Sequence, residues 1–308
     1  MQCINLNSIE TRYSELSSSI LRTPTTKLSS PVLRDLIKKS EIYLKLECFQ
    51  HSGTFKARGA LSVTKQIIKE NKKFGITAAS AGNHAIAAAW AAKVEKLSAK
   101  VVMQTSANPY RISLAKTYGA EIIMKEGGLA AFAEADRLKR EENRTFIHPF
   151  DGIDTTLGSA GVGLELIEDY SDLDAVVVAV GGGGLISGVA AAVKLKNNNC
   201  KIYGVEPIGA NSMAQSIKVG KPVTLNSIDT IADSLAPPMA LPFSYSVCKK
   251  FVDEFVTVTD KQICAGLSLF QQEGKLAVEP AAGAVLAGAI WPLRKKLTGK
   301  RIGLVICG

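Results

Sequence analysis

Short apolar runs alternate with amphipathic segments along most of the chain, and this alternation predicts parallel β-α-β units. An apolar run of four to eight residues is typical of a buried strand, whereas apolar residues spaced three and four apart indicate one face of a helix. The predicted strands are 42–46, 75–79, 99–103, 120–124, 145–148, 174–180, 201–205, 251–258 and 301–306. The predicted helices are 9–21, 60–68, 85–94, 109–118, 128–142, 158–170, 185–195, 210–219, 261–273 and 281–293.

The order of these elements predicts an α/β fold with two parallel-sheet modules, each built in three layers. We expect a large domain formed by residues 1–48 plus 149–308 and a small domain formed by residues 49–148. Segment 221–244 contains four prolines, so we expect a loop there that wraps the functional site. Asp260 is expected to cap the helix 261–273.

The composition is that of a globular protein, with 46% hydrophobic and 21% charged residues among 308. The formal net charge of +9 would suit nucleic acid, but the lysines are scattered and form no basic stripe with aromatic residues, so we expect no nucleic-acid partner. No apolar run of about 18 residues and no apolar N-terminal segment occurs, so we expect neither a membrane span nor a signal peptide. Six widely spaced cysteines without a C-x-x-C pair argue against zinc and fit a cytoplasmic location.

The segment Ser52-Gly53-Thr54-Phe55-Lys56-Ala57-Arg58-Gly59 joins a predicted strand to a predicted helix and contains the first candidate catalytic residue. Thr54 is expected to cap the helix, which places Lys56 in the first helical turn. The positive end of the helix dipole disfavours a charged lysine and favours the neutral amine that a Schiff-base lysine needs. For Lys56 taken alone, an ordinary solvated lysine is the alternative.

Three other predicted strands end in residues that suit ligand binding, and ligands in open α/β sheets collect at the carboxyl ends of strands. Ser80-Ala81-Gly82-Asn83-His84 exposes backbone N–H groups at a helix start, which favours an anion, although an ordinary capped turn has the same pattern. Gly181-Gly182-Gly183-Gly184-Leu185 allows successive N–H groups to converge on a phosphate, with close helix–strand packing as the alternative. The glycine run matches neither the dinucleotide nor the Walker pattern. Cys307 follows the last strand directly.

The motifs S-G-T-F-K-A-R-G-A, S-A-G-N-H-A and G-G-G-G-L, in this order and spacing, resemble those of the fold-type-II pyridoxal-phosphate enzymes, whose fold is that of the tryptophan synthase β-subunit. Within these enzymes the chain is most similar to the serine/threonine dehydratase and serine racemase family, over residues 23–308. The resemblance implies that Lys56 carries pyridoxal 5'-phosphate as a Schiff base, that Phe55 lies against the cofactor ring and that Asn83 binds the ring hydroxyl. It implies phosphate binding by the backbone of Gly181, Gly182, Gly183, Gly184 and Leu185. It also implies substrate-carboxylate binding by Ser80, Ala81, Gly82, Asn83 and His84.

The resemblance also places Cys307 beside the pyridine nitrogen of the cofactor. A neutral side chain there does not hold that nitrogen protonated, which favours prompt expulsion of a β-leaving group over a long-lived carbanion. Ala81 stands where related racemases carry a second serine, so the pattern favours dehydration over racemisation. The family segment A-G-Q-G-T is replaced by residues 157–163, L-G-S-A-G-V-G, which is expected to reshape one side of the pocket.

The family has a cation site whose ligands map to Glu206, the backbone of Ala210, and Ser212 in place of an acidic residue. One carboxylate is a weak site for magnesium or calcium, which leaves a monovalent ion, or no ion and a purely structural Glu206, as the alternatives. The chain ends at Gly308, inside a pattern that continues to an asparagine in the family, and we expect no regulatory C-terminal domain.

The resulting hypothesis is a cytoplasmic pyridoxal-phosphate-dependent L-threonine/L-serine dehydratase that releases a 2-oxo acid and ammonia, with Lys56 as the base at Cα. Its partner is a small amino-acid substrate, and the resemblance implies a homodimer. The alternatives are a serine racemase, a β-eliminase for another amino acid such as hydroxyaspartate or a diamino acid, and a non-catalytic binding protein that has kept the fold.

Overall fold

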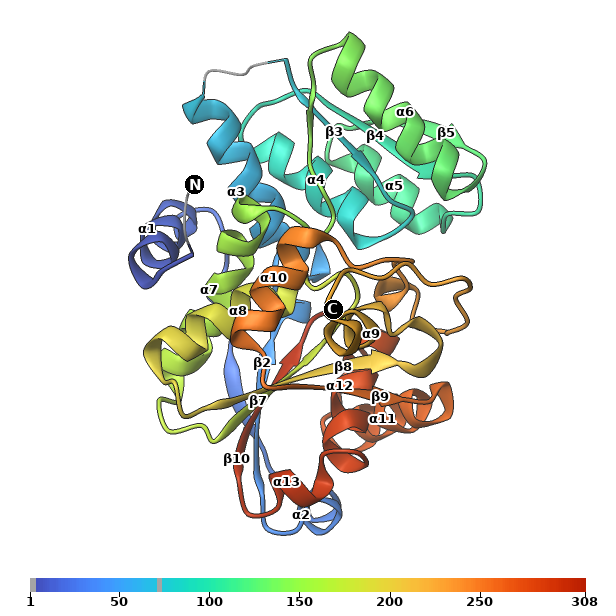
Figure 1. Cartoon of the computed structure of the whole chain (residues 1–308). Coiled ribbons are helices and arrows are strands. Elements are labelled where there is room, and N and C mark those ends of the chain that lie inside the picture. Colours follow the sequence, from blue (N-terminus) through green and yellow to red (C-terminus); the bar gives the residue numbers. More distant parts are fainter. Residues whose placement is uncertain (1–3, 71–73) are drawn as a thin grey trace.

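The computed structural model describes residues 4–70 and 74–308, and its strands form two separate sheets (Figure 1). The six-stranded sheet has the order β1-β2-β10-β7-β8-β9, and the four-stranded sheet has the order β5-β4-β3-β6. We call each sheet with its covering helices the six-stranded module and the four-stranded module. The strands of the first are β1 Thr25–Leu28, β2 Glu41–Leu46, β7 Ala175–Ala179, β8 Lys201–Pro207, β9 Glu254–Val258 and β10 Arg301–Ile306. Those of the second are β3 Ile76–Ala79, β4 Ala99–Gln104, β5 Glu121–Lys125 and β6 Thr145–Phe146.

Neighbouring strands pair in parallel throughout both sheets, except for β1, which lies antiparallel on the edge of β2. Strand β10 lies between β2 and β7, and its Leu304 is level with Leu44 and Val177. Strand β7 reads A-V-V-V-A and is buried along its whole length, as expected for a parallel strand covered on both faces. The predicted α/β fold with two parallel-sheet modules is therefore confirmed.

Helices cover both faces of the four-stranded sheet. Ala78 and Val101 belong to the apolar cluster that includes α3, α4 and α5, whereas their neighbours Ala79 and Val102 pack with α6. Successive strand residues point to opposite faces, so α6 lies on one face and the other helices on the opposite one. The helices are α1 Leu6–Leu16, α2 Pro31–Leu36, α3 Lys56–Lys69, α4 Asn83–Val94, α5 Pro109–Thr117, α6 Gly127–Glu141, α7 Ile153–Asp169, α8 Gly184–Lys196, α9 Ser212–Val219, α10 Pro242–Phe251, α11 Asp260–Glu273, α12 Pro280–Ile290 and α13 Arg294–Leu297.

Several local predictions are wrong. The apolar pattern predicts neither β1 nor α2, because β1 is short and mostly polar and α2 has only six residues. Helix α7 begins five residues before the predicted start, and α10 begins at Pro242 inside the predicted loop 221–244, with its proline in the first turn. Thr259, not Asp260, caps α11, because the Thr259 side chain accepts the Gln262 N–H while Asp260 binds the loop at Thr230 and Ile231.

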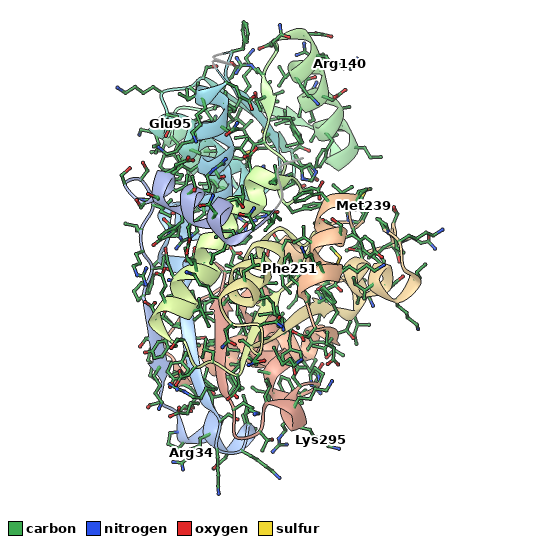
Figure 2. The ribbon with its side chains drawn as sticks, turned by 60° about the vertical axis from the view of Figure 1, so that its left-hand side comes forward. Arg34, Glu95, Arg140, Met239, Phe251 and Lys295 are labelled. Carbon is green, nitrogen blue, oxygen red and sulfur yellow. The ribbon has the colours of Figure 1, made fainter. Side chains whose placement is uncertain are left out.

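The chain crosses between the two modules twice, through the short turn His51–Gly53 into α3 and through residues 147–152 into α7. Figure 2 shows Arg140 near one end of the molecule and Arg34 and Lys295 at the other end, with the two modules stacked between them. All strands of the six-stranded sheet lie within residues 1–48 plus 149–308, and all strands of the four-stranded sheet lie within residues 49–148. The domain division itself stays a prediction. Within the described ranges, no helix is both long and apolar enough to cross a bilayer.

Candidate active site

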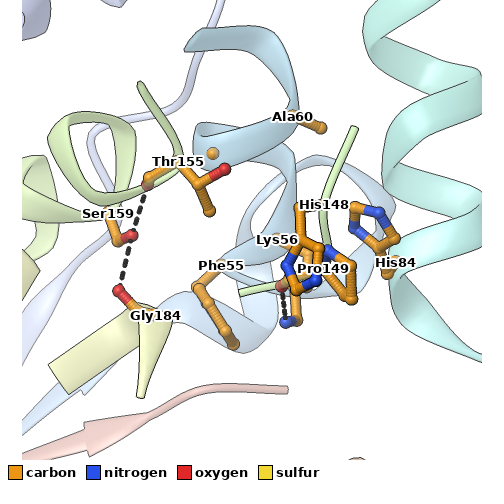
Figure 3. A pocket seen from close by; sticks show the side chains of 10 residues that line it. Phe55, Lys56, Ala60, His84, His148, Pro149, Thr155, Ser159 and Gly184 are labelled. Carbon is orange, nitrogen blue, oxygen red and sulfur yellow. Dashed lines mark hydrogen bonds between the residues drawn. The ribbon is translucent and has the colours of Figure 1, made fainter. Parts of the chain in front are cut away.

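Lys56 is the first residue of α3 and lies where the two modules meet (Figure 3). Its amine Nζ donates a hydrogen bond to the carbonyl oxygen of Pro149, in the second crossing segment. Burial lowers the pKa of this amine to about 8, and the nearby Cys307 opposes the change only in part. The Phe55 ring centroid lies 5.0 Å from Nζ. A lysine with so low a pKa has a substantial neutral fraction near pH 8, as a nucleophilic amine requires.

The turn before α3 fixes the direction of Lys56. Ser52 and Gly53 both have left-handed backbones, with φ of 63° and 74°. Phe55, the residue before the helix, donates its N–H to the Cys307 carbonyl at 3.1 Å, which ties the start of α3 to the end of β10. The expectation that Thr54 caps the helix is wrong in detail, because Phe55 holds the cap position, but the Thr54 hydroxyl still accepts the Lys56 N–H at 3.0 Å.

A fully buried network of charges holds α3 behind Lys56. The Arg58 guanidinium donates to Glu47 and Glu165, with four N···O distances between 2.8 and 2.9 Å. Lys45 Nζ donates to Glu165 Oε2 at 2.5 Å. Burial opposes the charge on Arg58, but the two carboxylates raise its pKa above the ordinary value. These ion pairs join β2, α3 and α7, so they set the position of the helix that carries Lys56.

The loop after β3, where the substrate carboxylate is predicted to bind, leads directly into α4. The Gly82 N–H donates to the Ser80 hydroxyl at 3.1 Å. His84 is buried and donates from Nε2 to the Ile147 carbonyl at 2.8 Å. Burial lowers the pKa of His84 to about 3, and the Lys56 and His148 charges act in the same direction. The ring is therefore neutral at physiological pH, and an anion in this loop meets backbone N–H groups rather than an imidazolium.

Asn83 faces a carboxylate that the sequence motifs do not indicate. Its side-chain Nδ2 donates to both oxygens of Glu279 at 2.8 Å. Glu279 precedes α12 and donates its own N–H to the Gly308 carbonyl at 3.1 Å. Arg111 of α5 reaches the same carboxylate at 3.6 Å and Asp233 at 3.0 Å. These contacts join the four-stranded module to the six-stranded module beside the site, and Asp233 belongs to the segment 221–244, which therefore reaches the site as expected.

The glycine loop after β7 has the shape of a cradle without side chains. Gly183 has φ +91°, and a Cβ on Gly182 would lie 2.1 Å from a ring carbon of Phe150. No described side chain caps the start of α8, so the first N–H groups of that helix are available to an anion. Ser159, in the segment 157–163 that departs from the family pattern, donates to the Gly184 carbonyl at 3.0 Å and to the Thr155 carbonyl at 2.7 Å (Figure 3). These features fit the phosphate group of pyridoxal phosphate.

Cys307 lies at the end of β10, as the sequence predicts, and is buried. Burial raises the pKa of its thiol to about 12, and the Glu279 carboxylate adds to the effect. Gly308 next to it would place a Cβ 3.3 Å from Glu279 Oε2, so this carboxylate lies beside the end of the strand. The thiol stays neutral, which is the protonation state that the predicted role of Cys307 requires.

The predicted cation ligands lie near the start of α9, whose Met213 would be 2.8 Å from a Cβ on Gly183 of the glycine loop. The buried Glu206 carboxylate accepts the N–H groups of Met213 at 2.9 Å and Ala214 at 2.7 Å, and burial raises its pKa to about 8. The Ser212 hydroxyl is buried without a hydrogen-bond partner, and Ala210 is buried in the short turn before the helix. Among the described residues no three His, Cys, Asp or Glu side chains gather at one point. One carboxylate with an unpaired hydroxyl does not fit a divalent ion, and the site stays a prediction.

The fold and the site define a pyridoxal-phosphate-binding enzyme of fold type II, and comparisons with known proteins agree. The model of the pyridoxal-phosphate dependent enzyme family matches residues 16–308, so the chain belongs to this family, within its serine/threonine dehydratase group. The chain is 44% identical to the phenylserine dehydratase of Ralstonia pickettii, over 87% of this chain and 82% of that protein. It is 34% identical to the L-threonine ammonia-lyase of Thermotoga maritima, over 99% of this chain and 75% of that one.

A solved structure gives the same result for the fold. Maize serine racemase superposes with a TM-score of 0.92 at 32% identity, over 99% of this chain and 93% of that chain. The predicted family, fold class and cofactor are thereby confirmed. The individual site residues stay predictions. The sequence motifs miss Pro149, Phe150, Arg111 and Glu279, although a glutamate directly before Pro280 at a helix start is a signal that points to the last of these.

Proposed function

We propose that this enzyme dehydrates β-hydroxy α-amino acids, with L-threonine and L-serine as substrates, and releases the 2-oxo acid and ammonia. The observation that supports the proposal best is the pairing of a buried lysine amine whose pKa is about 8 with a neutral thiol at the end of β10. The relatives named above include an ammonia-lyase and a dehydratase, and both names describe loss of a β-hydroxyl or of ammonia from a hydroxy amino acid.

Pyridoxal phosphate, when bound, supplies an electron sink for the charge left at Cα after the proton is removed. We assign its attachment to Lys56, its ring hydroxyl to Asn83 and its phosphate to the backbone of residues 181–185. The substrate carboxylate is assigned to the backbone of residues 80–84. With these assignments, the Cα–H bond of a bound amino acid would lie within reach of the Lys56 amine.

The Lys56 amine then takes the Cα proton, the Cβ–O bond breaks and the hydroxyl leaves as water. Hydrolysis of the resulting enamine returns one water and yields ammonia and the 2-oxo acid, so the net reaction needs no oxidant. With the cofactor bound, the neutral Cys307 would not hold its ring nitrogen protonated, which would favour elimination over a long-lived charge at Cα. The site has no serine at position 81 to reprotonate the opposite face, which supports elimination over racemisation.

We extend the proposal to a homodimer in the cytoplasm, because the family resemblance implies a dimer and the described cysteines are all free thiols. Racemisation stays the second candidate because a serine racemase shares the fold at 32% identity. Chiral analysis of serine recovered from the reaction separates the two, since a dehydratase leaves no D-serine. A non-catalytic binding protein would show a spectral change with ligand but release no ammonia.

The test is ammonia and 2-oxo acid release from L-threonine and L-serine by the purified, cofactor-loaded enzyme. Lys56→Ala should lower the rate by at least about a thousandfold, because it removes both the attachment point and the base. Lys69→Ala is the matched control, since Lys69 is an exposed lysine on the same helix that pairs with Glu15. Release of 2-oxobutyrate by Lys56→Ala at the parental rate would contradict the proposal.

A further inference from the structure

Four aromatic side chains form a continuous row from the surface of α6 to the glycine loop. We call Phe132, Phe146, His148 and Phe150 the aromatic row. Successive ring centroids lie 6.1, 5.8 and 4.6 Å apart, with interplanar angles of 62°, 79° and 86°. Each contact is therefore an edge-to-face pair, the arrangement that aromatic rings prefer.

The inner end of the aromatic row reaches the reacting groups. Pro149, whose carbonyl oxygen accepts a hydrogen bond from the Lys56 amine, lies between His148 and Phe150 in the chain. The Phe150 ring lies against Gly182 of the glycine loop, where a Cβ would be 2.1 Å from it. His148 lines the same pocket as Lys56 and His84, and Figure 3 shows its ring beside both side chains. If a substrate binds as proposed, a substituent on its β-carbon would lie close to His148, at this end of the row.

The aromatic row is not fully enclosed, although Phe146 packs against the apolar cluster under α6. Phe132 is 44% exposed, and Phe146, His148 and Phe150 are each only half-buried. His148 accepts the N–H groups of Phe150 at 3.3 Å and Asp151 at 2.9 Å through Nδ1, which fixes the angle of its ring and of the segment after it. The ring edges are thus held in place while part of their surface stays open to a ligand.

The row also lacks charge. Burial lowers the pKa of His148 to about 4, with Asp151 opposing, so the ring is neutral in the working range. Arg111 of α5 lies 3.1 Å from a Cβ built on Gly82, but it is paired with Asp233 and Glu279. A substrate with a β-carboxylate would find no unpaired cation among these described neighbours, whereas an apolar ring finds apolar edges.

We propose that the aromatic row binds an aryl group on the β-carbon, so that the enzyme prefers β-aryl-β-hydroxy α-amino acids to threonine and serine. The inference rests on the proposed dehydration and specifies its substrate class. With 3-phenylserine, Lys56 takes the Cα proton, the β-hydroxyl leaves as water, and hydrolysis gives phenylpyruvate and ammonia. One water leaves and one is consumed, so atoms balance and no redox partner is needed. Phe150, at the inner end of the row, is the specificity-determining residue in this arrangement.

The test compares kcat/KM for L-threo-3-phenylserine, L-threonine and L-serine with the cofactor-loaded enzyme. We expect phenylserine to exceed threonine by about tenfold or more, since ring burial and edge-to-face contact both favour it. Phe150→Leu keeps apolar bulk but removes the ring, and it should lower the phenylserine-to-threonine ratio by about tenfold. Phe74→Leu is the control, because Phe74 is 65% exposed and precedes β3 at the end of the strand away from the site.

Binding of L-phenylalanine, which has no β-hydroxyl and is not dehydrated, gives a second measurement. It should bind the wild-type enzyme more tightly than L-valine does, and Phe150→Leu should remove the difference. A kcat/KM for threonine equal to that for phenylserine would overturn the inference while leaving the proposed dehydration intact. A phenylserine-to-threonine ratio of kcat/KM that Phe150→Leu leaves unchanged would do the same. An equal fall in kcat/KM for both substrates in Phe150→Leu would also overturn the inference, because it would show that the row is only structural. Absence of ammonia from every β-hydroxy amino acid would overturn the proposed function itself.

Discussion

The pH dependence of cofactor attachment follows from the low pKa of Lys56 and can be calculated in advance. Only the neutral amine attacks the cofactor aldehyde. With a pKa of about 8, the neutral fraction is about 9% at pH 7 and about 91% at pH 9. A lysine with the ordinary pKa of 10.5 would be about 0.03% neutral at pH 7 and still rising at pH 10. The rate of attachment should therefore rise about tenfold between pH 7 and 9 and then level off.

The titratable neighbours in the pocket do not obscure this change. His84 and His148 have pKa values lowered by burial to about 3 and about 4, so both are already neutral at pH 7. Cys307, with a pKa raised by burial to about 12, stays a neutral thiol. Of the described groups in contact with Lys56, only its own amine titrates between pH 7 and 9.

The assay uses enzyme stripped of its cofactor and mixed with pyridoxal phosphate at a series of pH values. Borohydride trapping followed by mass spectrometry measures the adduct on Lys56. The rate is divided by the rate per neutral amine of N-acetyl-lysine amide at the same pH, which corrects for ionisation of the cofactor itself. Lys56→Arg serves as the blank. A corrected rate that climbs evenly through pH 10, or an adduct on a different lysine, would refute the reasoning.

Three further predictions concern the surroundings of the site. Arg58→Met should lower the free energy of unfolding by about 3–5 kcal/mol, because two buried carboxylates lose their partner. The control Arg140→Met, on the exposed face of α6, should change it by less than about 0.5 kcal/mol. Denaturant titration measures both changes. EDTA should leave the wild-type activity unchanged, and loss of that activity in EDTA would contradict the absence of a divalent-ion site. Ser212→Asp adds a second carboxylate near Glu206 and should create a magnesium-dependent rise in Tm. Arg111→Met should raise KM up to about fivefold with less effect on kcat, because it removes contacts between the modules, and an unchanged KM would show that these contacts do not affect substrate binding.

The parts of the site that the sequence predicts are those carried by short continuous motifs. Lys56 and the glycine loop stand at strand-to-helix turns, where the local pattern of apolar and small residues fixes both the element and its end. Cys307 is predicted for the same reason, since it follows a strand of six apolar-rich residues. The sheet topology follows from the alternation of strands and helices, and the antiparallel edge strand β1 is missed because T-T-K-L has no alternating apolar pattern.

The parts that the sequence does not predict depend on packing between distant segments. Glu279 approaches Asn83 from a position 196 residues away along the chain, and Arg111 reaches Asp233 from 122 residues away. Such contacts form only when both modules are in place. Phe150 is similar, because its role depends on the absence of a Cβ at Gly182, on a separate loop further along the chain. A sequence motif shows which groups are present, but the partner of each group is set by the tertiary fold.

Burial gives the site a consistent electrostatic character. The same loss of solvation that lowers the pKa of Lys56 also keeps His84 and His148 uncharged, and it keeps the thiol of Cys307 protonated. An anionic ligand therefore meets few side-chain cations here, and its charge must be stabilised by backbone N–H groups at the starts of α4 and α8. Each helix follows a glycine at its N-cap, Gly82 or Gly183, and neither has a side-chain cap, which leaves these groups accessible. The neutral lysine and the anion-binding helix starts are thus two consequences of one buried pocket, and a substitution that lets water enter should raise the pKa of Lys56 and weaken phosphate binding together.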